Sequence, residues 1–391
     1  MDAALFARII SDKNITNMKK IKYKYPAADI HELIALLQEG SFQTLPLWDF
    51  AGRKLVFLKN VVQVSMSSVK LLLTPQNSKE RFGIQAMGEE ITSSMTIEDI
   101  DFSRDSVRKI LQGFAPSDEQ EERIFGMKKG LEFISNRQNK ITKENIHTLY
   151  QLAIGGSLAH ENDKLLPDHH YRHDSVYIVG LEVEHSGLPH EKLPGYMAGL
   201  IDFANTDSVM NDLLKAAVIH FYIAYIHPYF DGNGRMARLV HLWYLVQQGY
   251  SSTLFVPFSS HIEKTRRKYY DAYTITEQNR KLSGVLDVTP FLVYFVEHVY
   301  NKLDEAVTKP DVLLMFKTAL ENGVVTEKEK DLWYFSFSAY GSKEFSTKQL
   351  ERDFAHAAYA TIRAFVLKFE KIGLLTSQKY GNRVKYRINL H

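Results

Sequence analysis

Twelve residues, from His227 to Arg238, combine side chains that suit displacement at phosphorus. Two glycines flank an asparagine at 232–234, and glycine readily adopts positive φ, so successive N–H groups can point into one concavity. Helix-like patterns precede and follow this stretch, which places the concavity at the start of a helix, where the dipole favours an anion. We therefore expect a phosphate-binding nest here.

The side chains around the nest supply the remaining chemistry. Asp231 offers the hard oxygen that Mg²⁺ takes together with phosphate oxygens. Arg235 and Arg238 are three residues apart, so both can face one polyphosphate. His227, with an ordinary pKa of about 6.5, suits the role of a base that accepts the proton of an attacking hydroxyl.

Each feature alone has an ordinary structural explanation, and only their ordered combination indicates a site. Residues 232–237 also match the loose dinucleotide fingerprint G-x-G-x-x-A, but that motif requires a preceding strand, and here a helix pattern precedes. The sequence has no Walker loop and no G-x-S-x-G element. Asp168, His169 and His170 form a polar cluster that we interpret as a loop rather than a metal site.

The elements that must position these residues are mainly helical. Apolar residues recur three and four apart through 61–115, with a break at Thr74-Pro75, and in six further segments, which predicts a helical bundle. Those segments are 124–133, 143–153, 193–203, 210–225, 235–248 and 264–278. Alternation at 175–180, followed by turn formers, predicts a β-hairpin inserted before the two central helices. Residues 1–60 are less clearly patterned, with an amphipathic segment at 30–37 and a short strand at 54–58.

The end of the chain has a different pattern. Segments 348–354 and 359–372 read as two helices, and 379–383 reads as the turn of a hairpin, which together is the winged-helix order. Residues 341–391 hold ten Lys/Arg against four Asp/Glu, a local net charge of +6. A contact with DNA or with a protein is expected there, and the sequence leaves both open.

Composition excludes several classes of protein. The 391 residues suggest two or three domains, and the absence of cysteine excludes disulfides, thiolate metal sites and cysteine nucleophiles. The net charge of +2 argues against a chain that coats nucleic acid. Apolar stretches fall short of the roughly 18 residues of a membrane helix, and the first residues lack a signal-peptide pattern. We expect a cytoplasmic protein without membrane contact, and leave homo-oligomers open.

The stretch His227 to Arg238 resembles the signature of the Fic family, H-P-F-x-[DE]-G-N-G-R-x-x-R, at every specified position except the third, where Tyr229 replaces Phe. The resemblance extends over about residues 85–300. It implies a mainly α fold, a helical bundle with an inserted β-hairpin flap, followed here by the winged helix. We divide the chain into an N-terminal region at 1–115, a catalytic core at 116–310 and a winged-helix domain at 311–391.

The resemblance implies a protein adenylyltransferase that moves AMP from ATP, with Mg²⁺, to a Ser, Thr or Tyr hydroxyl of a target protein. His227 would be the catalytic base and Asp231 the metal ligand. The residues expected to bind ATP are Gly232, Asn233, Gly234, Arg235, Met236, Ala237, Arg238 and Tyr270. The flap residues expected to dock the target are Tyr177, Ile178 and Leu188. Glu277 stands where the family often has an asparagine near the adenine base of ATP.

The family also has an inhibitory motif, [ST]-x-x-x-E-[GN], which 94–99 resembles. Ser94 and Glu98 would share a helix face, and the resemblance implies that Glu98 pairs with Arg238 and blocks the productive γ-phosphate pose. Asp99 departs from the expected Gly or Asn, so the helix could end differently. Two other functions stay open: removal of AMP or another phosphotransfer by the same fold, and a DNA-binding regulator built on the winged helix.

Overall fold

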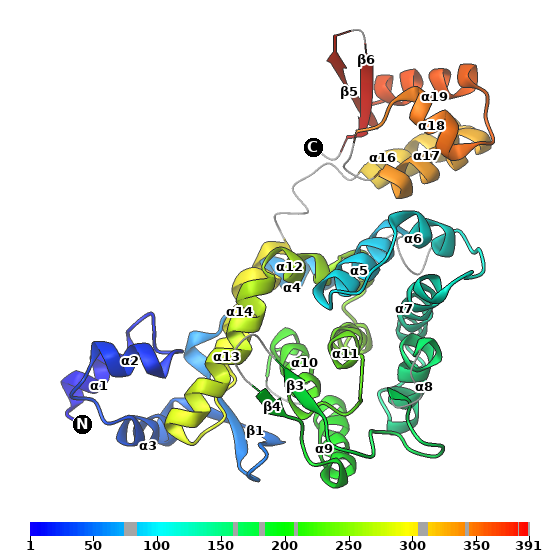
Figure 1. Ribbon diagram of the computed structural model, residues 1–391. Helices are drawn as coiled ribbons and strands as arrows, with labels where there is room; N and C mark the ends of the chain where they lie inside the picture. The colour runs from blue at the N-terminus through cyan, green and yellow to red at the C-terminus, as the bar shows by residue number, and fades with distance from the viewer. Residues whose placement is uncertain are drawn as a thin grey trace.

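The computed structural model describes residues 1–73, 84–158, 163–179, 184–206, 210–303, 312–340, 344–381 and 383–389. Its architecture is mainly helical, and its strands pair only as two-stranded sheets within the described ranges (Figure 1). The helices are α1 Ala3–Ile10, α2 Met18–Lys24, α3 Ile30–Gly40, α4 Met66–Leu73, α5 Ile84–Ile97, α6 Arg104–Leu111, α7 Glu119–Ser135, α8 Lys143–Ala153, α9 Leu193–Asn205, α10 Asp212–Ile226, α11 Asn233–Gln247, α12 Phe258–Lys264, α13 Arg266–Ser283, α14 Thr289–His298, α16 Val312–Glu321, α17 Glu327–Tyr340, α18 Thr347–Phe354 and α19 Tyr359–Lys371. The strands are β1 Phe42–Trp48, β2 Lys54–Leu58, β3 Tyr177–Val179, β4 Glu184–Ser186, β5 Leu375–Tyr380 and β6 Arg383–Ile388.

Helices α10 and α11 form the centre of the largest core, and nearly all of their side chains are buried. This burial explains why both read as apolar around most of their circumference. Asn211 is the N-cap of α10, where its side chain accepts a hydrogen bond from Leu213 N (2.9 Å), and Gly232 is the N-cap of α11. The other helices of the bundle surround this pair (Figure 1). The fold therefore presents the short loop between α10 and α11 on a rigid support.

The predicted helices are present with ends shifted by up to five residues, and the predicted 264–278 lies in α13. Within 61–115 the helical pattern is interrupted between α5 and α6. Helix α12, which was not predicted, is separated from α13 by a break at Thr265. The Thr265 hydroxyl bonds back to His261 O (2.8 Å) and to the Tyr294 hydroxyl (2.8 Å), and a side chain that bonds its own preceding turn competes with the helix. Apolar spacing continues across the break, so periodicity could not reveal it.

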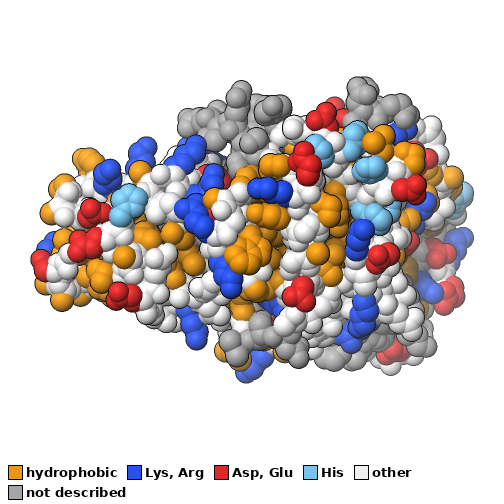
Figure 2. Space-filling model, turned by 90° about the horizontal axis from the view of Figure 1, so that it is seen from below, with side chains coloured by type: hydrophobic (Ala, Val, Ile, Leu, Met, Phe, Trp, Pro, Cys, Tyr) orange, Lys and Arg blue, Asp and Glu red, His pale blue; other side chains and the backbone are white. Residues whose placement is uncertain are grey.

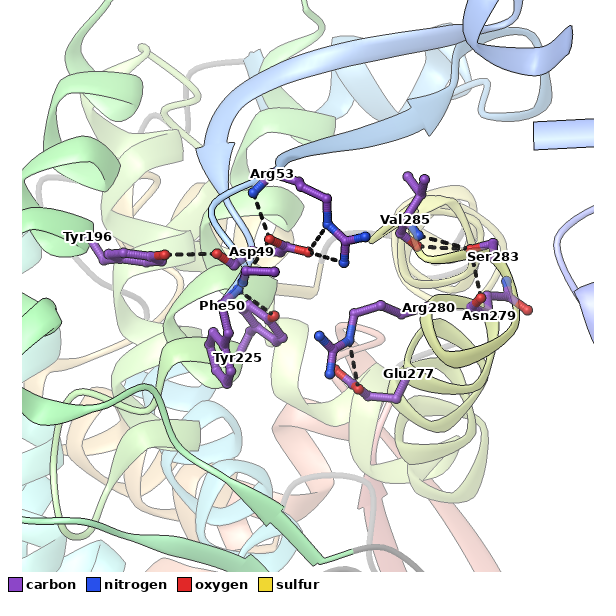
Figure 3. A network of polar contacts seen from close by, with 11 residues as sticks. Asp49, Phe50, Arg53, Tyr196, Tyr225, Glu277, Asn279, Arg280, Ser283 and Val285 are labelled. Atoms are coloured by element: carbon purple, nitrogen blue, oxygen red, sulfur yellow. Dashed lines mark hydrogen bonds and ion pairs between the residues drawn. The ribbon is translucent and has the colours of Figure 1, made fainter. Parts of the chain in front are cut away.

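The first 60 residues add a small core and a hairpin. Helices α1 to α3 pack on one another in a cluster of their own. Strand β2 was predicted, whereas its partner β1 was not, because Pro46 and mixed polarity weaken its alternation. The hairpin tip is fixed on the bundle: Asp49 binds Arg53 (2.9 Å) and accepts at its carbonyl from Tyr196 (2.8 Å), while Phe50 stacks on Tyr225 at 4.3 Å (Figure 3).

Helix α5 is held against α12 by a buried acid. Glu90 is 3% exposed, and its carboxylate accepts from Ser259 N (2.9 Å) and from the Ser259 hydroxyl. Burial raises the pKa of Glu90, although these hydrogen bonds favour its charged form. The hydrophobic core runs from α5 and α6 into α7 without a break near residue 115. The described residues of α5 and α6, which precede the predicted catalytic core, therefore share one hydrophobic core with α7.

The C-terminal residues form a unit with its own core around Trp333 and Phe369. Its order is α16, α17, a bridge between Phe345 and Tyr386, α18, α19 and the antiparallel pair β5–β6. The predicted pair of helices and the hairpin are thus present. Arg108 of α6 donates to Ala339 O at the end of α17 (2.5 Å), which joins this unit to the rest (Figure 1). The predicted domain boundary at 310 lies outside the described residues.

Candidate active site

The loop between α10 and α11 carries the predicted base. His227 follows α10 with a left-handed backbone (φ +55°), and its N–H donates to Ile223 O (3.0 Å). Its ring Nδ1 lies 3.2 Å from the carbonyl oxygen of Ala224. Because a carbonyl oxygen only accepts, Nδ1 carries the proton of the neutral ring, and the lone pair is on Nε2. A neutral ring with its lone pair on Nε2 is the form that a general base requires.

Asn233 and Gly232 hold this loop in shape. The Asn233 amide accepts from Tyr229 N (2.9 Å) and donates to Tyr229 O (2.8 Å), and it is almost fully buried. The Tyr229 ring stacks on Tyr150 at 3.9 Å between centroids, so this aromatic position packs in the core. Gly232 has φ +80°, and a Cβ there would lie 2.6 Å from the Ile154 side chain. Glycine is therefore required at 232 for both its backbone conformation and its lack of a side chain.

The start of α11 has the features of an anion site. Gly232 has no side chain with which to cap the first N–H groups of the helix. The carboxylate of Glu98 approaches this end so closely that a Cβ on Gly234 would lie 2.1 Å from Glu98 Oε1. A carboxylate from the same chain therefore lies against the predicted phosphate nest.

The two motif arginines are both buried and have different partners. Arg235 Nη2 pairs with Asp231 Oδ2 (2.9 Å), and the Asp231 side chain is 54% exposed. Burial lowers the pKa of Arg235, although Asp231 and Glu98 favour its charged form. Its Nε has no hydrogen-bond partner in the described part of the chain. A guanidinium still stays charged here and can donate to a further anion.

Arg238 is held by α5. Its Nη2 lies 2.9 Å from Glu98 Oε1 and donates to Ser94 O (2.9 Å), while its Nε donates to the Ser94 hydroxyl (2.8 Å). Burial disfavours the charge on Arg238, but Glu98, together with Tyr269 and Tyr270, more than offsets burial and raises the pKa of the guanidinium. The structure thus brings Ser94, Glu98 and Arg238 together from segments about 140 residues apart in sequence.

A second set of contacts fixes the end of α5. The helix ends at Ile97, and Asp99 takes the left-handed conformation (φ +53°) that Gly or Asn would favour. The Asp99 carboxylate makes a two-point ion pair with Arg266, whose Nη1 is 2.7 Å from Oδ1. The Tyr270 hydroxyl donates to Ile97 O (3.1 Å). Asp99 therefore adopts the left-handed conformation without being Gly or Asn, and it adds an ion pair to α13.

Comparison with known proteins identifies the region that contains this loop. The model of the Fic/DOC family matches residues 140–245, which include the whole stretch from His227 to Arg238. This chain carries a Fic/DOC domain. The chain is 25% identical over 182 residues to protein adenylyltransferase fic-1 of Caenorhabditis briggsae, covering 45% of this chain and 31% of that protein. It is 25% identical over 229 residues to protein adenylyltransferase Fic of Drosophila willistoni, covering 56% and 41% of the two proteins.

The fold of this chain is also similar to that of a solved structure. A Fic family protein from Desulfovibrio desulfuricans G20 superposes with a TM-score of 0.51 at 18% identity, over 83% of this chain and 97% of that one. The present chain spans less than half the length of the curated relatives named above. Similarity therefore establishes the Fic domain and its fold.

The predicted flap is a β-hairpin beside the Fic motif. Strand β3 pairs antiparallel with β4, with Tyr177 opposite Ser186 and Ile178 opposite His185. Residues 180–183, between the two strands in sequence, lie outside the described residues. Leu188 differs from its expected docking role, because its side chain is fully buried and its N–H donates to Ile226 O (3.3 Å). Leu188 therefore anchors the hairpin on α10 and offers no surface to a target.

The remaining predicted ATP residues are arranged unevenly around the motif. Met236 and Ala237 are fully buried, so their side chains pack in the core and only their backbone faces the helix end. Tyr270 is 41% exposed and is engaged with the end of α5. Glu277 pairs with Arg280 (3.3 Å), and its Oε1 is buried without a hydrogen-bond partner among the described groups. An adenine base placed near Glu277 would meet a carboxylate, which only accepts hydrogen bonds.

Asp231 is the carboxylate beside the nest that could bind a metal ion. Within the described ranges, no group of three or more His, Asp or Glu side chains is arranged to hold a metal. Asp231 is exposed and adjoins the start of α11, which fits Mg²⁺ that arrives with phosphate oxygens and keeps most of its water. The residues present therefore fit a metal carried by ATP.

Histidines gather at the end of the molecule that carries α8 (Figure 2). The rings of His147 and His170 are 4.7 Å apart, and those of His169 and His173 are 6.1 Å apart. Burial lowers the pKa of His147 and of His170, so neutral rings pack together there. Residues 168–170 lie in a loop, and the nearby His173 ring contacts Phe230 of the Fic motif at 5.0 Å.

Two residues of this site were not assigned a role from the sequence. Arg266 lies 167 positions from Asp99, and neither has a distinctive neighbour pattern, so no sequence signal indicates their pairing. Arg172 occurs in the stretch of resemblance, but nothing in its spacing indicates what it binds. In the structure its guanidinium reaches the carbonyl oxygen of His227 (2.7 Å).

Proposed function

We propose that this protein transfers AMP from ATP to a Ser, Thr or Tyr hydroxyl of a target protein. The observation that carries this proposal is the α10–α11 loop, where His227, Asp231, Arg235 and Arg238 surround the start of α11. The names of the curated relatives, protein adenylyltransferases, agree with it. An anion nest with two guanidinium groups suits a triphosphate, and the adjacent imidazole suits an attacking hydroxyl.

In the proposed reaction, His227 Nε2 accepts the proton of the target hydroxyl as its oxygen attacks the α-phosphorus. The bond from the α-phosphorus to the bridging oxygen of the β-phosphate breaks, and pyrophosphate leaves. The first N–H groups of α11 and Arg238 hold the leaving phosphates in line. Asp231 would hold Mg²⁺, which supplies neutralisation of phosphate charge. Antiparallel pairing of the target segment with the flap would present the hydroxyl.

The same geometry supports restraint of the transferase by Glu98. Its carboxylate pairs with Arg238 and lies against Gly234, so it competes with a phosphate for both the guanidinium and the nest. A restrained enzyme of this kind could also remove AMP, with water in place of the target hydroxyl. Mass spectrometry of modified protein distinguishes gain of an adenylyl group from gain of a phosphate or loss of AMP.

The test is transfer of label from [α-³²P]ATP into protein by the Glu98→Gly variant, with Mg²⁺. The same variant with His227→Ala should keep its fold and its affinity for ATP, but should lose about 10²- to 10⁴-fold in rate, the usual contribution of a general base. Label from the γ-position should stay out of protein. Transfer at an equal rate without His227, or incorporation of the γ-label, would refute the proposal.

A second candidate function concerns the C-terminal unit, which we propose is a winged helix that binds DNA. Support comes from the order α17, bridge, α18, α19 and hairpin, and from the exposed face of α19, which carries Arg363 and Lys371. Fluorescence anisotropy with duplex DNA at two salt concentrations tests it. Replacing Arg363 and Lys371 by Ala should weaken binding and lower its salt slope, whereas Lys328→Ala, an exposed lysine of α17, should not. Affinity independent of salt would contradict DNA binding.

A further inference from the structure

Arg172 is a buried cation without an acidic partner in contact. It is 2% exposed, and no carboxylate among the described residues lies within ion-pair distance of it. Burial lowers its pKa, against only distant attraction from Asp174 and Glu191. Burying a guanidinium costs free energy unless its N–H groups make hydrogen bonds, so the groups that accept from Arg172 indicate its structural role.

All three branches of the guanidinium donate to backbone carbonyl oxygens. Nε donates to His227 O (2.7 Å), Nη1 to Asp174 O (2.6 Å), and Nη2 to Leu188 O. The backbone N–H of Arg172 also donates to Pro228 O (2.9 Å). One side chain therefore joins the start of the catalytic loop, the entry to the flap and the exit from the flap.

The contact with His227 bears on a strained residue. His227 is a non-glycine residue in the left-handed region, a conformation that persists only where the surroundings enforce it. A charge-assisted bond to its carbonyl stabilises that turn, and the turn sets where the imidazole lies. The neighbouring carbonyl of Pro228 is held by the same residue.

The contact with Leu188 bears on the flap. The base of the hairpin is closed by Gly187 N to Val176 O (3.0 Å), and Leu188 N donates to Ile226 O (3.3 Å). Glycine at 187 leaves the space that the Arg172 guanidinium occupies, because a Cβ there would lie 2.8 Å from Arg172 Nη2. The path of the flap and the place of the guanidinium are thus fitted to each other.

We propose that Arg172 is a positioning residue that sets the distance between the flap and the His227 imidazole. This role rests on the AMP transfer proposed above, in which the flap presents the hydroxyl and His227 accepts its proton. The rigid fork of arginine reaches three carbonyls at once, whereas the single ammonium of lysine keeps the charge but cannot span them. The shape of the side chain, as well as its charge, therefore matters.

The test uses full-length protein in the Glu98→Gly background. Arg172→Lys should lower kcat for AMP transfer about 100-fold, the scale of a misplacement of about 1 Å, while KM for ATP changes by less than about twofold. Gly187→Ala, which presses on Arg172 without removing it, should act in the same direction. Arg137→Lys is the matched control, because Arg137 also donates to a helix-end carbonyl, Val246 O (3.2 Å), away from the site.

Rates are expressed per ATP-binding molecule, so that loss of folded protein does not imitate the effect. Hydrogen exchange provides a second readout that needs no activity: Arg172→Lys should speed exchange at 187–189 and 226–229, with α8 unchanged. If the Glu98→Gly protein transfers no AMP but these segments still loosen, the proposed function fails and the structural link stands. Unchanged kcat, or unchanged exchange in both segments, would overturn the positioning role.

Discussion

Removing the Glu98 carboxylate should release the transferase. The pair with Arg238 is one charge-assisted hydrogen bond at 2.9 Å between a buried guanidinium and a carboxylate whose side chain is 29% exposed. Such a bond is worth about 1.5–3 kcal/mol, which corresponds to about a 10- to 150-fold shift between restrained and released arrangements. Because the Ser94 contacts of Arg238 remain, we expect activity to rise by no more than this factor.

The assay is self-modification by Glu98→Gly beside wild type at equal ATP and Mg²⁺. Glu98→Gln keeps a neutral hydrogen bond to Arg238 and should fall between the two proteins. Glu89→Gly is the control for weakening of the helix, because Glu89 is an exposed acid of α5 that has no contact with Arg238 among the described residues, and it should not activate. Arg238→Ala should not activate either, since it removes the partner of the phosphate as well. Equal or lower activity of Glu98→Gly would refute the restraint.

Three further changes test the site and the fold around it. Asp231→Ala should lose Mg²⁺-dependent transfer and require more Mg²⁺ for ATP binding, because water would replace a carboxylate ligand; unchanged metal dependence in a titration would contradict this. Arg266→Gln should activate a few-fold by releasing Asp99, and the gain should vanish in 1 M salt, where the Debye length is about 3 Å, because the pair is exposed. Burial raises the pKa of Asp287 to about 6 in the folded state, so the free energy of unfolding of wild type falls as pH rises from about 4 through 6. Asp287→Asn has no such loss, and its free energy of unfolding relative to wild type should rise by at most about 3 kcal/mol between pH 4 and 7.5. If urea unfolding gave the same difference between the two proteins at both pH values, the raised pKa would be refuted.

Local sequence was enough to indicate the loop and its helices. The glycines at 232 and 234 and the order of His227, Asp231 and Arg235 lie within one turn and its flanks, so their spacing already limits where they can point. The same holds for α8, whose ends were predicted without a shift, because its apolar face and the Thr142 cap are both encoded locally. For the pairing of Ser94 and Glu98 with Arg238, the resemblance to a family was needed.

Other features were decided only by the tertiary structure. The ion pair of Asp99 with Arg266 joins α5 to α13, and Arg172 joins the flap to His227, across intervals in which no local pattern operates. Leu188 reads as one more residue of a hairpin, and only the packing of that hairpin on α10 shows that it is an anchor. Propensity and periodicity act over a few residues, whereas which buried polar group meets which carbonyl depends on how whole helices pack.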